Sequence, residues 1–242
     1  MNKIHEPEHA LSEKERVGKI SQIRELVFGA QDGLLVPLGV ISSVAGAFSN
    51  NHIVIVAGIS EALAGAFSMA TGAYLASQAE RQVHLNELKK EREAIEKYPE
   101  DEKEEMILLH KKEGLSDKDS RDLVSILLKS KTAYFNTMVQ KELGIDPNPA
   151  GTPTKDAVFV GVSYLISAMV PLFPYFFLKG NPAIITSILA TLAALFVIGF
   201  MKGKVASLPY FKSGLQVLLV GTASGIGGYF IGVFLPHVLG IK

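Results

Sequence analysis

Two carboxylates interrupt apolar stretches near the start of the chain. Between Leu26 and Gln78 the only formal charges belong to Asp32 and Glu61. A charged side chain at the centre of a bilayer costs about 2.5–3.5 kcal/mol on insertion, so an acid kept there is a functional candidate by default. Asp32 lies near one end of its stretch and can reach the interface, whereas Glu61 lies well inside its own. Both residues therefore predict a place where a cation or a proton is bound within the membrane.

Met69 adds a softer ligand to this pair. If the two stretches form a helical hairpin, Asp32 and Met69 fall at similar depth, and Glu61 lies two turns away on nearly the same face as Met69. Pro37 leaves the carbonyl of Gly33 without its usual helical partner, one turn from Asp32. Carboxylate, carbonyl and thioether ligands together suit a borderline divalent ion better than magnesium or calcium. A membrane methionine more often packs than binds metal, so Met69 counts only through its level with Asp32.

A second group of potential ligands lies in the charged middle of the chain. Three sets there have helical spacing, so the members of each set share one helix face. They are Glu80, His84, Glu87 and Glu91, then Glu102 and Glu105, then Met138 and Glu142. An acidic stripe interleaved with lysines is more often a solvated helix face, so spacing alone leaves metal binding and a solvated face both open.

The composition excludes several function classes. The chain has 242 residues, and 24 Lys and Arg balance 24 Asp and Glu, so it lacks the basic charge typical of proteins that bind nucleic acid. It contains no cysteine, which excludes disulfides, a thiolate nucleophile and Cys-ligated zinc. Its hydrophobic residues, 48% of the total, are separated from the charged ones in long blocks, which is typical of membrane proteins.

Five stretches are long enough to cross a bilayer, which takes about 20 apolar residues. They are Leu26–Phe48, Ile53–Ala76, Ala157–Leu178, Pro182–Met201 and Leu215–Leu239. Too few polar residues remain to cover five such helices in a soluble protein. We therefore predict an all-α integral membrane protein with five transmembrane helices in contact with lipid, and with a helical domain inserted between the second and the third.

The distribution of positive charge predicts the orientation. Of the 24 Lys and Arg, 22 lie in the N-terminal tail, in the central region and between the fourth and fifth stretches. By the positive-inside rule these parts face the cytosol, and the C-terminus faces the other side. The predicted organisation is a cytosolic tail over 1–25, transmembrane helices over 26–79, a cytosolic helical domain over 80–156 and transmembrane helices over 157–242.

Local signals divide the central region into helices. The second stretch has no helix breaker before Tyr98-Pro99, so its helix is expected to continue to Lys97. Pro99 suits a first helical position, and three acids follow it at the favourable end of the helix dipole. Ser116 is expected to cap a further helix or helix pair, which ends at Gly144.

Four short motifs resemble the vacuolar iron transporter family. They are Gly-Ala-Gln-Asp-Gly-Leu at 29–34, Ser-Met-Ala-Thr-Gly at 68–72, the acidic turn at 99–105 and Lys-Glu-Leu-Gly-Ile at 141–145. The resemblance covers nearly the whole chain from Ile23 onward, in order. It implies a five-helix homodimer with its pore at the dimer interface, which exports Fe(II), and often Mn(II), from the cytosol in exchange for protons.

The resemblance also implies roles for individual residues. It assigns Asp32, Glu61 and Met69 to the translocation path. It makes the central region a metal-binding domain, whose ligands are Glu91, Glu102, Glu105, Met138 and Glu142. Iron or manganese is then the transported substrate, and neither an enzymatic activity nor a resident cofactor is expected.

Three positions depart from the family's pattern. Members often have a glutamate where this chain has Ala94, a second methionine where it has Val139, and a glutamate where it has Ala73. The cytosolic site is therefore expected to bind fewer ions, or to bind them more weakly. The acids that could compensate are Glu87, Glu93 and Glu96. Glu87, which shares a helix face with Glu91, is counted among the predicted metal ligands.

Two other function classes are the alternatives. A membrane-bound di-iron enzyme would use paired Glu-x-x-His motifs, and the chain has only Glu6-x-x-His9, which Pro7 interrupts. A metal sensor without transport would need the central glutamates but has no use for Asp32 and Glu61. The expected location is a prokaryotic plasma membrane, with a vacuolar membrane as the alternative. The residue types alone leave iron, manganese, cobalt and nickel open.

Overall fold

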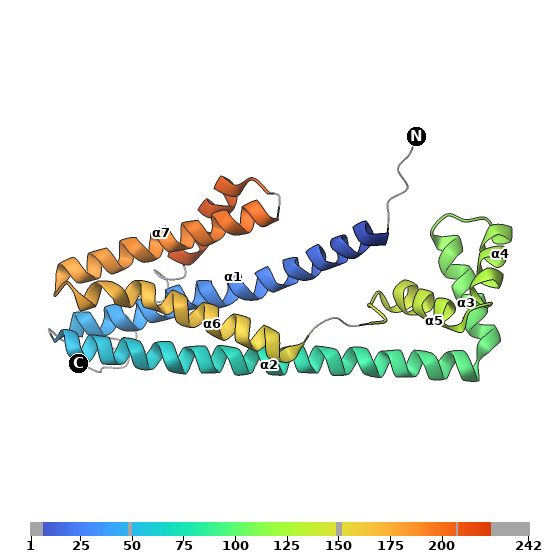
Figure 1. The fold of residues 1–242 in the computed structure, drawn as a ribbon, viewed down its shortest axis with the longest axis horizontal. Coiled ribbons are helices and arrows are strands. Elements are labelled where there is room, and N and C mark those ends of the chain that lie inside the picture. The colour runs from blue at the N-terminus through green and yellow to red at the C-terminus, as the bar shows by residue number, and fades with distance from the viewer. Residues whose placement is uncertain (1–6, 48–49, 149–151, 207, 224–242) are drawn as a thin grey trace, which may run out of the picture. The chain divides into compact units, whose positions relative to one another are not determined.

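The computed structural model describes residues 7–47, 50–148, 152–206 and 208–223, and nearly all of them are helical (Figure 1). The helices are α1 (Pro7–Ala47), α2 (Asn51–Lys97), α3 (Pro99–Lys112), α4 (Asp117–Leu127), α5 (Lys131–Met138), α6 (Pro153–Leu172) and α7 (Asn181–Val205). Two short helices of other types are the π-helix η1 (Val139–Leu143) and the 3-10 helix η2 (Phe173–Phe176). Residues 210–223 are also helical.

Four of these helices, α1, α2, α6 and α7, are long and apolar enough to cross a membrane. Helices α2 and α7 contain the second and fourth predicted stretches in full. Helix α1 covers the first as far as Ala47, and Phe48 lies outside the described residues. The third, Ala157–Leu178, is α-helical only to Leu172 and continues as the 3-10 helix η2, so its predicted end was too late. The fifth, Leu215–Leu239, is helical as far as residue 223, and its remainder lies outside the described residues. Helix α1 already begins at Pro7, so most of the predicted N-terminal tail is part of this helix.

Helix α2 is continuous from Asn51 to Lys97, as predicted. Its 47 residues are more than twice the roughly 20 that are needed to cross a bilayer. Its first half is apolar and its second half is charged. The helix ends before Tyr98, and Pro99 opens α3 with three acids in the first turn. Acids are favourable there because the helix N-terminus carries a partial positive charge.

Contacts divide the described chain into two compact units. The apolar unit contains the described residues up to Leu75 and those from Pro153 onward, and the charged unit is Ala76–Thr152. The boundary falls within α2, which contributes residues to both. Each unit has hydrophobic core residues of its own.

In the apolar unit, α6 lies along α1 and also contacts α7 (Figure 1). Tyr164 of α6 packs against Ala62 and Ala66 of α2. Many large apolar side chains remain exposed, for example Phe67, of which 72% is exposed. Exposed apolar surface of this extent is typical of helices that face lipid or another apolar chain.

Two glycines allow α1 and α6 to approach each other closely. A Cβ atom on Gly29 would lie 2.5 Å from the carbonyl oxygen of Val160, and one on Gly33 would lie 2.3 Å from the carbonyl oxygen of Tyr164. Both distances are far below van der Waals contact, so the packing requires glycine at these positions. The contact fixes how the residues around Gly33, including Asp32, lie along α6.

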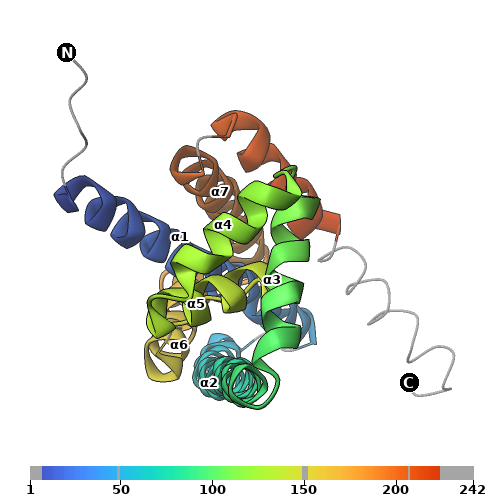
Figure 2. The same cartoon turned by 90° about the vertical axis from the view of Figure 1, so that its right-hand side faces the viewer.

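The charged unit has a small core formed by α3, α4 and α5, which face the viewer in Figure 2. The core residues are Met106, Ile107, Val124, Tyr134 and Met138. Each of the three helices contributes apolar residues to this core, and most of their charged residues lie on the surface.

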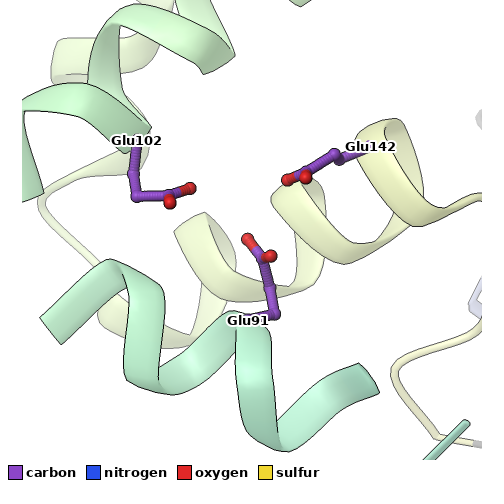
Figure 3. A group of neighbouring side chains, drawn as sticks. All are labelled: Glu91, Glu102 and Glu142. Carbon is purple, nitrogen blue, oxygen red and sulfur yellow. The ribbon is translucent and has the colours of Figure 1, made fainter. Parts of the chain in front are cut away.

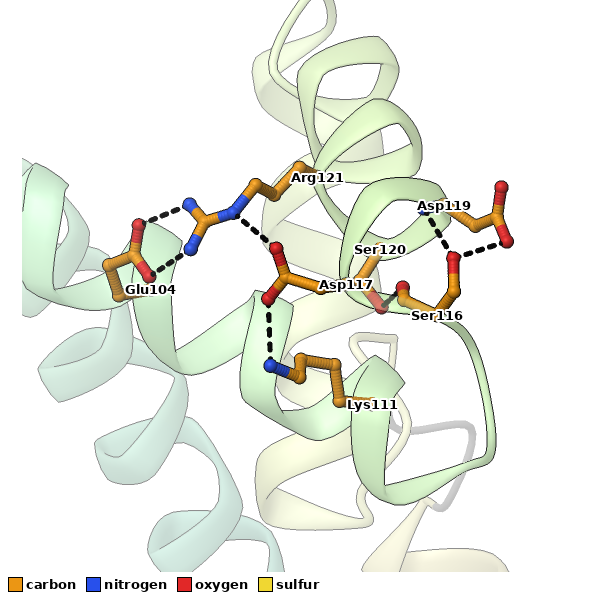
Figure 4. A network of polar contacts seen from close by, with 7 residues as sticks. All are labelled: Glu104, Lys111, Ser116, Asp117, Asp119, Ser120 and Arg121. Carbon is orange, nitrogen blue, oxygen red and sulfur yellow. Dashed lines mark hydrogen bonds and ion pairs between the residues drawn. The ribbon is translucent and has the colours of Figure 1, made fainter.

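Polar contacts fix the start of α4 against α3 (Figure 4). Ser116 caps α4 as predicted, because its Oγ accepts a hydrogen bond from the backbone N–H of Asp119 at 3.1 Å. Arg121 of α4 donates to Glu104 of α3 at 2.8 Å and to Asp117 at 3.1 Å. These side chains are exposed, so each ion pair contributes little stability. Their main effect is on the direction in which α4 leaves α3.

We predict that Gly33→Ala destabilises the apolar unit. The new methyl group would meet backbone atoms of Tyr164, which cannot rotate away, and such overpacking typically costs about 1–3 kcal/mol. The matched control is Gly39→Ala in the same helix, where a Cβ meets nothing within 4 Å and alanine has the better helix propensity. Thermal melting of the full-length protein in detergent, followed by circular dichroism, should show a lower transition temperature for Gly33→Ala alone. Equal transitions for the two variants would contradict the close approach of α1 and α6.

Candidate metal centre

Three glutamates from three separate helices meet in the charged unit. Glu91 lies in α2, Glu102 in α3 and Glu142 in η1. One carboxylate oxygen of each lies within 4.8 Å of those of the other two. Figure 3 shows the three side chains pointing toward a common space. This glutamate trio forms a three-sided oxygen site, an arrangement that can surround a single divalent cation.

Each helix supplies its glutamate through a feature of its own sequence. The unbroken α2 carries Glu91 well beyond the apolar half of the helix. Pro99 starts α3 so that Glu102 lies in its first turn. Gly144, with a φ of 66°, ends η1 two residues after Glu142, at the predicted helix end. The π-helix itself was not predicted; its wider turn changes the direction in which Glu142 points.

Among the described residues, the charges that act most strongly on the three carboxylates all belong to other acids. Only 6% of Glu91 is exposed. As carboxylates, Glu91 and Glu102 each have one buried oxygen without a hydrogen-bond donor among the described residues. Burial and the charges of Glu142 and Glu102 raise the pKa of Glu91 to about 7. Burial and neighbouring acids also raise the pKa values of Glu102 and Glu142.

The raised pKa makes Glu91 a group that exchanges a proton near neutral pH. In its protonated form Glu91 donates a hydrogen bond to Glu142, which relieves part of the repulsion between them. A cation bound to the trio relieves the same repulsion and requires the ionised carboxylate. A proton and a metal ion would therefore compete for this site.

Two residues of α5, Tyr134 and Met138, lie in the core of the same unit as the trio. Met138, predicted as a metal ligand, is fully buried in the core of the charged unit. Tyr134, in the same core, has a buried hydroxyl without a partner in the described part of the chain. Burial and the charges of Glu102 and Glu91 raise the pKa of Tyr134 to about 12, so its hydroxyl remains a neutral donor beside the acids.

The other two predicted carboxylates of this region lie outside the trio. Glu105 is exposed, three residues beyond Glu102 on α3, and its charge acts on Glu91 and Glu142. It therefore adds to the negative potential around the site. Glu87 accepts a hydrogen bond from Lys90 Nζ at 2.7 Å. Its role as a metal ligand stays a prediction.

In the apolar unit, Glu61 meets a hydroxyl group. The Tyr164 hydroxyl of α6 donates a hydrogen bond to Oε1 of Glu61 on α2 at 2.5 Å. Met69 packs against the cluster that contains Tyr164. Asp32 directly precedes Gly33, which lies against the Tyr164 backbone. Tyr164 thus bonds to Glu61, belongs to the cluster that Met69 packs against, and contacts the residue next to Asp32.

Sequence reasoning missed Tyr164 and Tyr134. Both are less than 5% exposed, and a buried tyrosine needs a hydrogen-bond partner for its hydroxyl. The signal for Tyr164 was available, since a tyrosine within an apolar helix has to find such a partner in the protein. The signal for Tyr134 was weaker, because a tyrosine in a charged, amphipathic helix is equally at home on its surface.

Comparison with known proteins identifies the family. The sequence pattern of the VIT family matches residues 23–233 of this chain. The chain is 32% identical to vacuolar iron transporter 1 of Eucalyptus grandis over 208 residues, which are 86% of this chain and 84% of that protein. It is 33% identical to vacuolar iron transporter 1 of Tulipa gesneriana, with 86% and 84% of the two chains covered. It is 27% identical to the vacuolar iron transporter of Plasmodium falciparum, with 89% and 82% covered. The chain therefore belongs to the VIT family, as its motifs implied.

Proposed function

We propose that this protein carries a divalent transition metal, Fe(II) and also Mn(II), out of the cytosol across a membrane in exchange for protons. The observation that carries the proposal is the convergence of Glu91, Glu102 and Glu142 from three helices, with ligand atoms within 4.8 Å of one another. The names of the relatives, vacuolar iron transporters, agree with a metal ion as the cargo.

The trio is suited to capture. Three ionised carboxylates so close together repel one another, and two of them have buried oxygens without donors in the described chain. A divalent cation neutralises two of the charges and supplies the missing partner to those oxygens. Oxygen ligands alone would also accept magnesium, so selection for a transition metal falls to the softer thioether ligands, Met138 and Met69.

Proton exchange follows from the same electrostatics. Near neutral pH, Glu91 holds a proton part of the time, because its pKa is raised to about 7. An arriving metal ion displaces this proton, and a proton helps the ion to leave. Coupling of metal and proton movement therefore needs no additional group in the capture site.

The translocation path runs through the acids of the apolar helices. Metal collected by the trio passes to Asp32 and Met69, then to Glu61, and leaves on the other side. The order rests on the depths of these residues in the predicted hairpin of the first two spans. The charged unit faces the cytosol under the positive-inside rule. Two copies of the chain form the pore between them, as the resemblance implies.

The residue types in the trio favour transport over di-iron catalysis. Helical di-iron enzymes combine glutamates with histidines in their metal site. The trio consists of glutamates alone. The buried His110 of α3 instead has its Nδ1 3.4 Å from an oxygen of Glu113.

We predict that Asp32→Ala and Glu61→Ala each abolish metal transport. Each variant removes one of the two carboxylates on the path. At that position no charged ligand then offsets the cost of dehydrating the ion inside the membrane. The measurement is uptake of Fe(II), Mn(II) and Zn(II) into proteoliposomes under an imposed pH gradient. The control, Asp122→Ala, removes an exposed acid of α4 that is not among the predicted metal ligands. Unchanged flux in both path variants would rule out this route.

We further expect the affinity of the full-length protein for Mn(II) to fall as the pH is lowered from about 8 to about 6. Glu91 takes up a proton over this range, and the metal ion must displace it. Calorimetric titrations in buffers with different ionisation enthalpies measure the affinity and the number of protons released together. Glu91→Gln should reduce proton release and weaken binding by more than about tenfold, whereas Asp122→Asn, at an exposed position of α4, should change neither. Binding that releases no proton from the wild type would contradict the assignment of Glu91.

Glu91 should also lower the stability of the metal-free protein at alkaline pH. Its pKa is raised from 4.5 to about 7, so the folded protein binds this proton more tightly than the unfolded chain. The folding free energy that the proton contributes is present at acid pH and is lost as the pH rises toward and through 7. Glu91→Gln should therefore stabilise the protein at about pH 8 in the presence of a chelator, by about 3 kcal/mol at most.

The pH dependence provides the control for this stabilisation. At about pH 4, below the ordinary pKa of 4.5, Glu91 is mostly protonated in the folded and the unfolded wild type, so the melting temperatures of Glu91→Gln and the wild type should converge. Glu93→Gln, which changes the same charge on the surface of the same helix, should melt like the wild type at both pH values. Equal melting of Glu91→Gln and the wild type at alkaline pH would show that the three carboxylates do not repel one another.

A further inference from the structure

The hydroxyl of Tyr164 is held where it can act on a single carboxylate oxygen. Only 2% of Tyr164 is exposed. Its hydroxyl donates to Oε1 of Glu61 at 2.5 Å, a distance typical of a strong hydrogen bond to a carboxylate. The contact joins α6 to α2 across 103 positions of sequence.

The residues around Tyr164 are small where the tyrosine side chain packs against α2. A Cβ atom on Gly65 would lie 2.3 Å from the Tyr164 hydroxyl oxygen, so glycine is needed one turn beyond Glu61. Ala62 and Ala66 present only small side chains to the tyrosine ring. At the backbone of Tyr164, the close approach of Gly33 fixes α6 against α1. Tyr164 is therefore held by close packing at its backbone, against Gly33, and at its hydroxyl, against Gly65.

The two oxygens of Glu61 are in different situations. Oε1 is occupied by the Tyr164 hydroxyl, whereas Oε2 is buried and has no hydrogen-bond partner within the described residues. A buried acceptor without a partner is costly. One hydrogen bond thus fixes the orientation of the carboxylate and leaves its second oxygen free for an ion.

We propose that Tyr164 is a positioning residue for transport: its hydroxyl holds Oε1 of Glu61 so that Oε2 is presented to the passing metal ion. This inference rests on the proposed function, in which Glu61 lies on the translocation path. The ion then meets a carboxylate that is already oriented, and only a small reorganisation is needed when it binds.

The test removes only the hydroxyl. Tyr164→Phe should raise the KM of Fe(II) transport in proteoliposomes by about tenfold, because a hydrogen bond to a charged group is lost. Its Vmax should change much less, since the path and its carboxylates remain. Tyr175→Phe is the matched control, because Tyr175 is also 2% exposed and its hydroxyl has no partner among the residues described. An unchanged KM in Tyr164→Phe, or an equal rise in Tyr175→Phe, would overturn the inference.

A second substitution distinguishes positioning from a general loss of structure. Glu61→Asp keeps the charge but withdraws the carboxylate from the hydroxyl, so adding Tyr164→Phe to it should raise KM little further. Full additivity of the two changes would contradict an action of Tyr164 through Glu61. If Tyr164→Phe does not fold, Gly65→Ala displaces the ring while keeping the hydroxyl, and it should raise KM in the same way. Gly39→Ala, with no atom near its added methyl group, is its control.

The proposed function and this inference fail in different ways. Absence of metal flux in the wild type, or full flux in Glu61→Ala, would disprove the proposed path itself. Normal transport by Tyr164→Phe together with inactive Glu61→Ala would leave the path intact and disprove only the positioning role of the hydroxyl.

Discussion

A carboxylate that leaves water has to be stabilised by a cation, a proton or a hydrogen-bond donor. Much of what is distinctive in this protein follows from that constraint. The charged unit brings the ligand atoms of three glutamates within 4.8 Å of one another. The apolar unit keeps Glu61 within a helix long and apolar enough to cross a membrane. In each unit the ionised carboxylates destabilise the fold unless a cation, a proton or a hydrogen-bond donor is bound to them.

The two units meet this cost by different means. In the trio, the acids compensate one another by sharing a proton, as the hydrogen bond from protonated Glu91 to Glu142 and the raised pKa of Glu91 indicate. At Glu61, the compensation is a hydroxyl group supplied by the fold, at 2.5 Å. A shared proton leaves readily when a cation arrives, whereas Tyr164 remains in place. The protonation of the trio therefore changes near neutral pH, while Glu61 is held in one orientation by Tyr164.

The elements of the fold were predictable where a local signal determines them. The length of the apolar runs gave the first four long helices, Pro99 and Ser116 gave helix starts, and Gly144 gave a helix end. The glutamates of the trio were predictable as candidates, because helical spacing assigns each one to a face of its own helix. Spacing alone could not show which of them meet, whereas the family resemblance had assigned Glu91, Glu102 and Glu142 to one site, and the structure brings these three together. Glu87 has the same helical spacing as Glu91 but pairs with Lys90, and this depends on where α3 and η1 pack.

Long-range pairing also explains why Tyr164 escaped prediction. Its partner lies 103 positions away, and the contact exists because Gly33 and Gly65 remove side-chain atoms at two points around the tyrosine. In the sequence these glycines look like ordinary small residues of helix packing, which they are. The close packing and the hydrogen bond nevertheless depend on the same residues here. The same missing Cβ atoms that bring the helices together allow a hydroxyl to reach a carboxylate on another helix. A substitution that disturbed this packing would therefore disturb the hydrogen bond to Glu61 as well as the stability of the apolar unit.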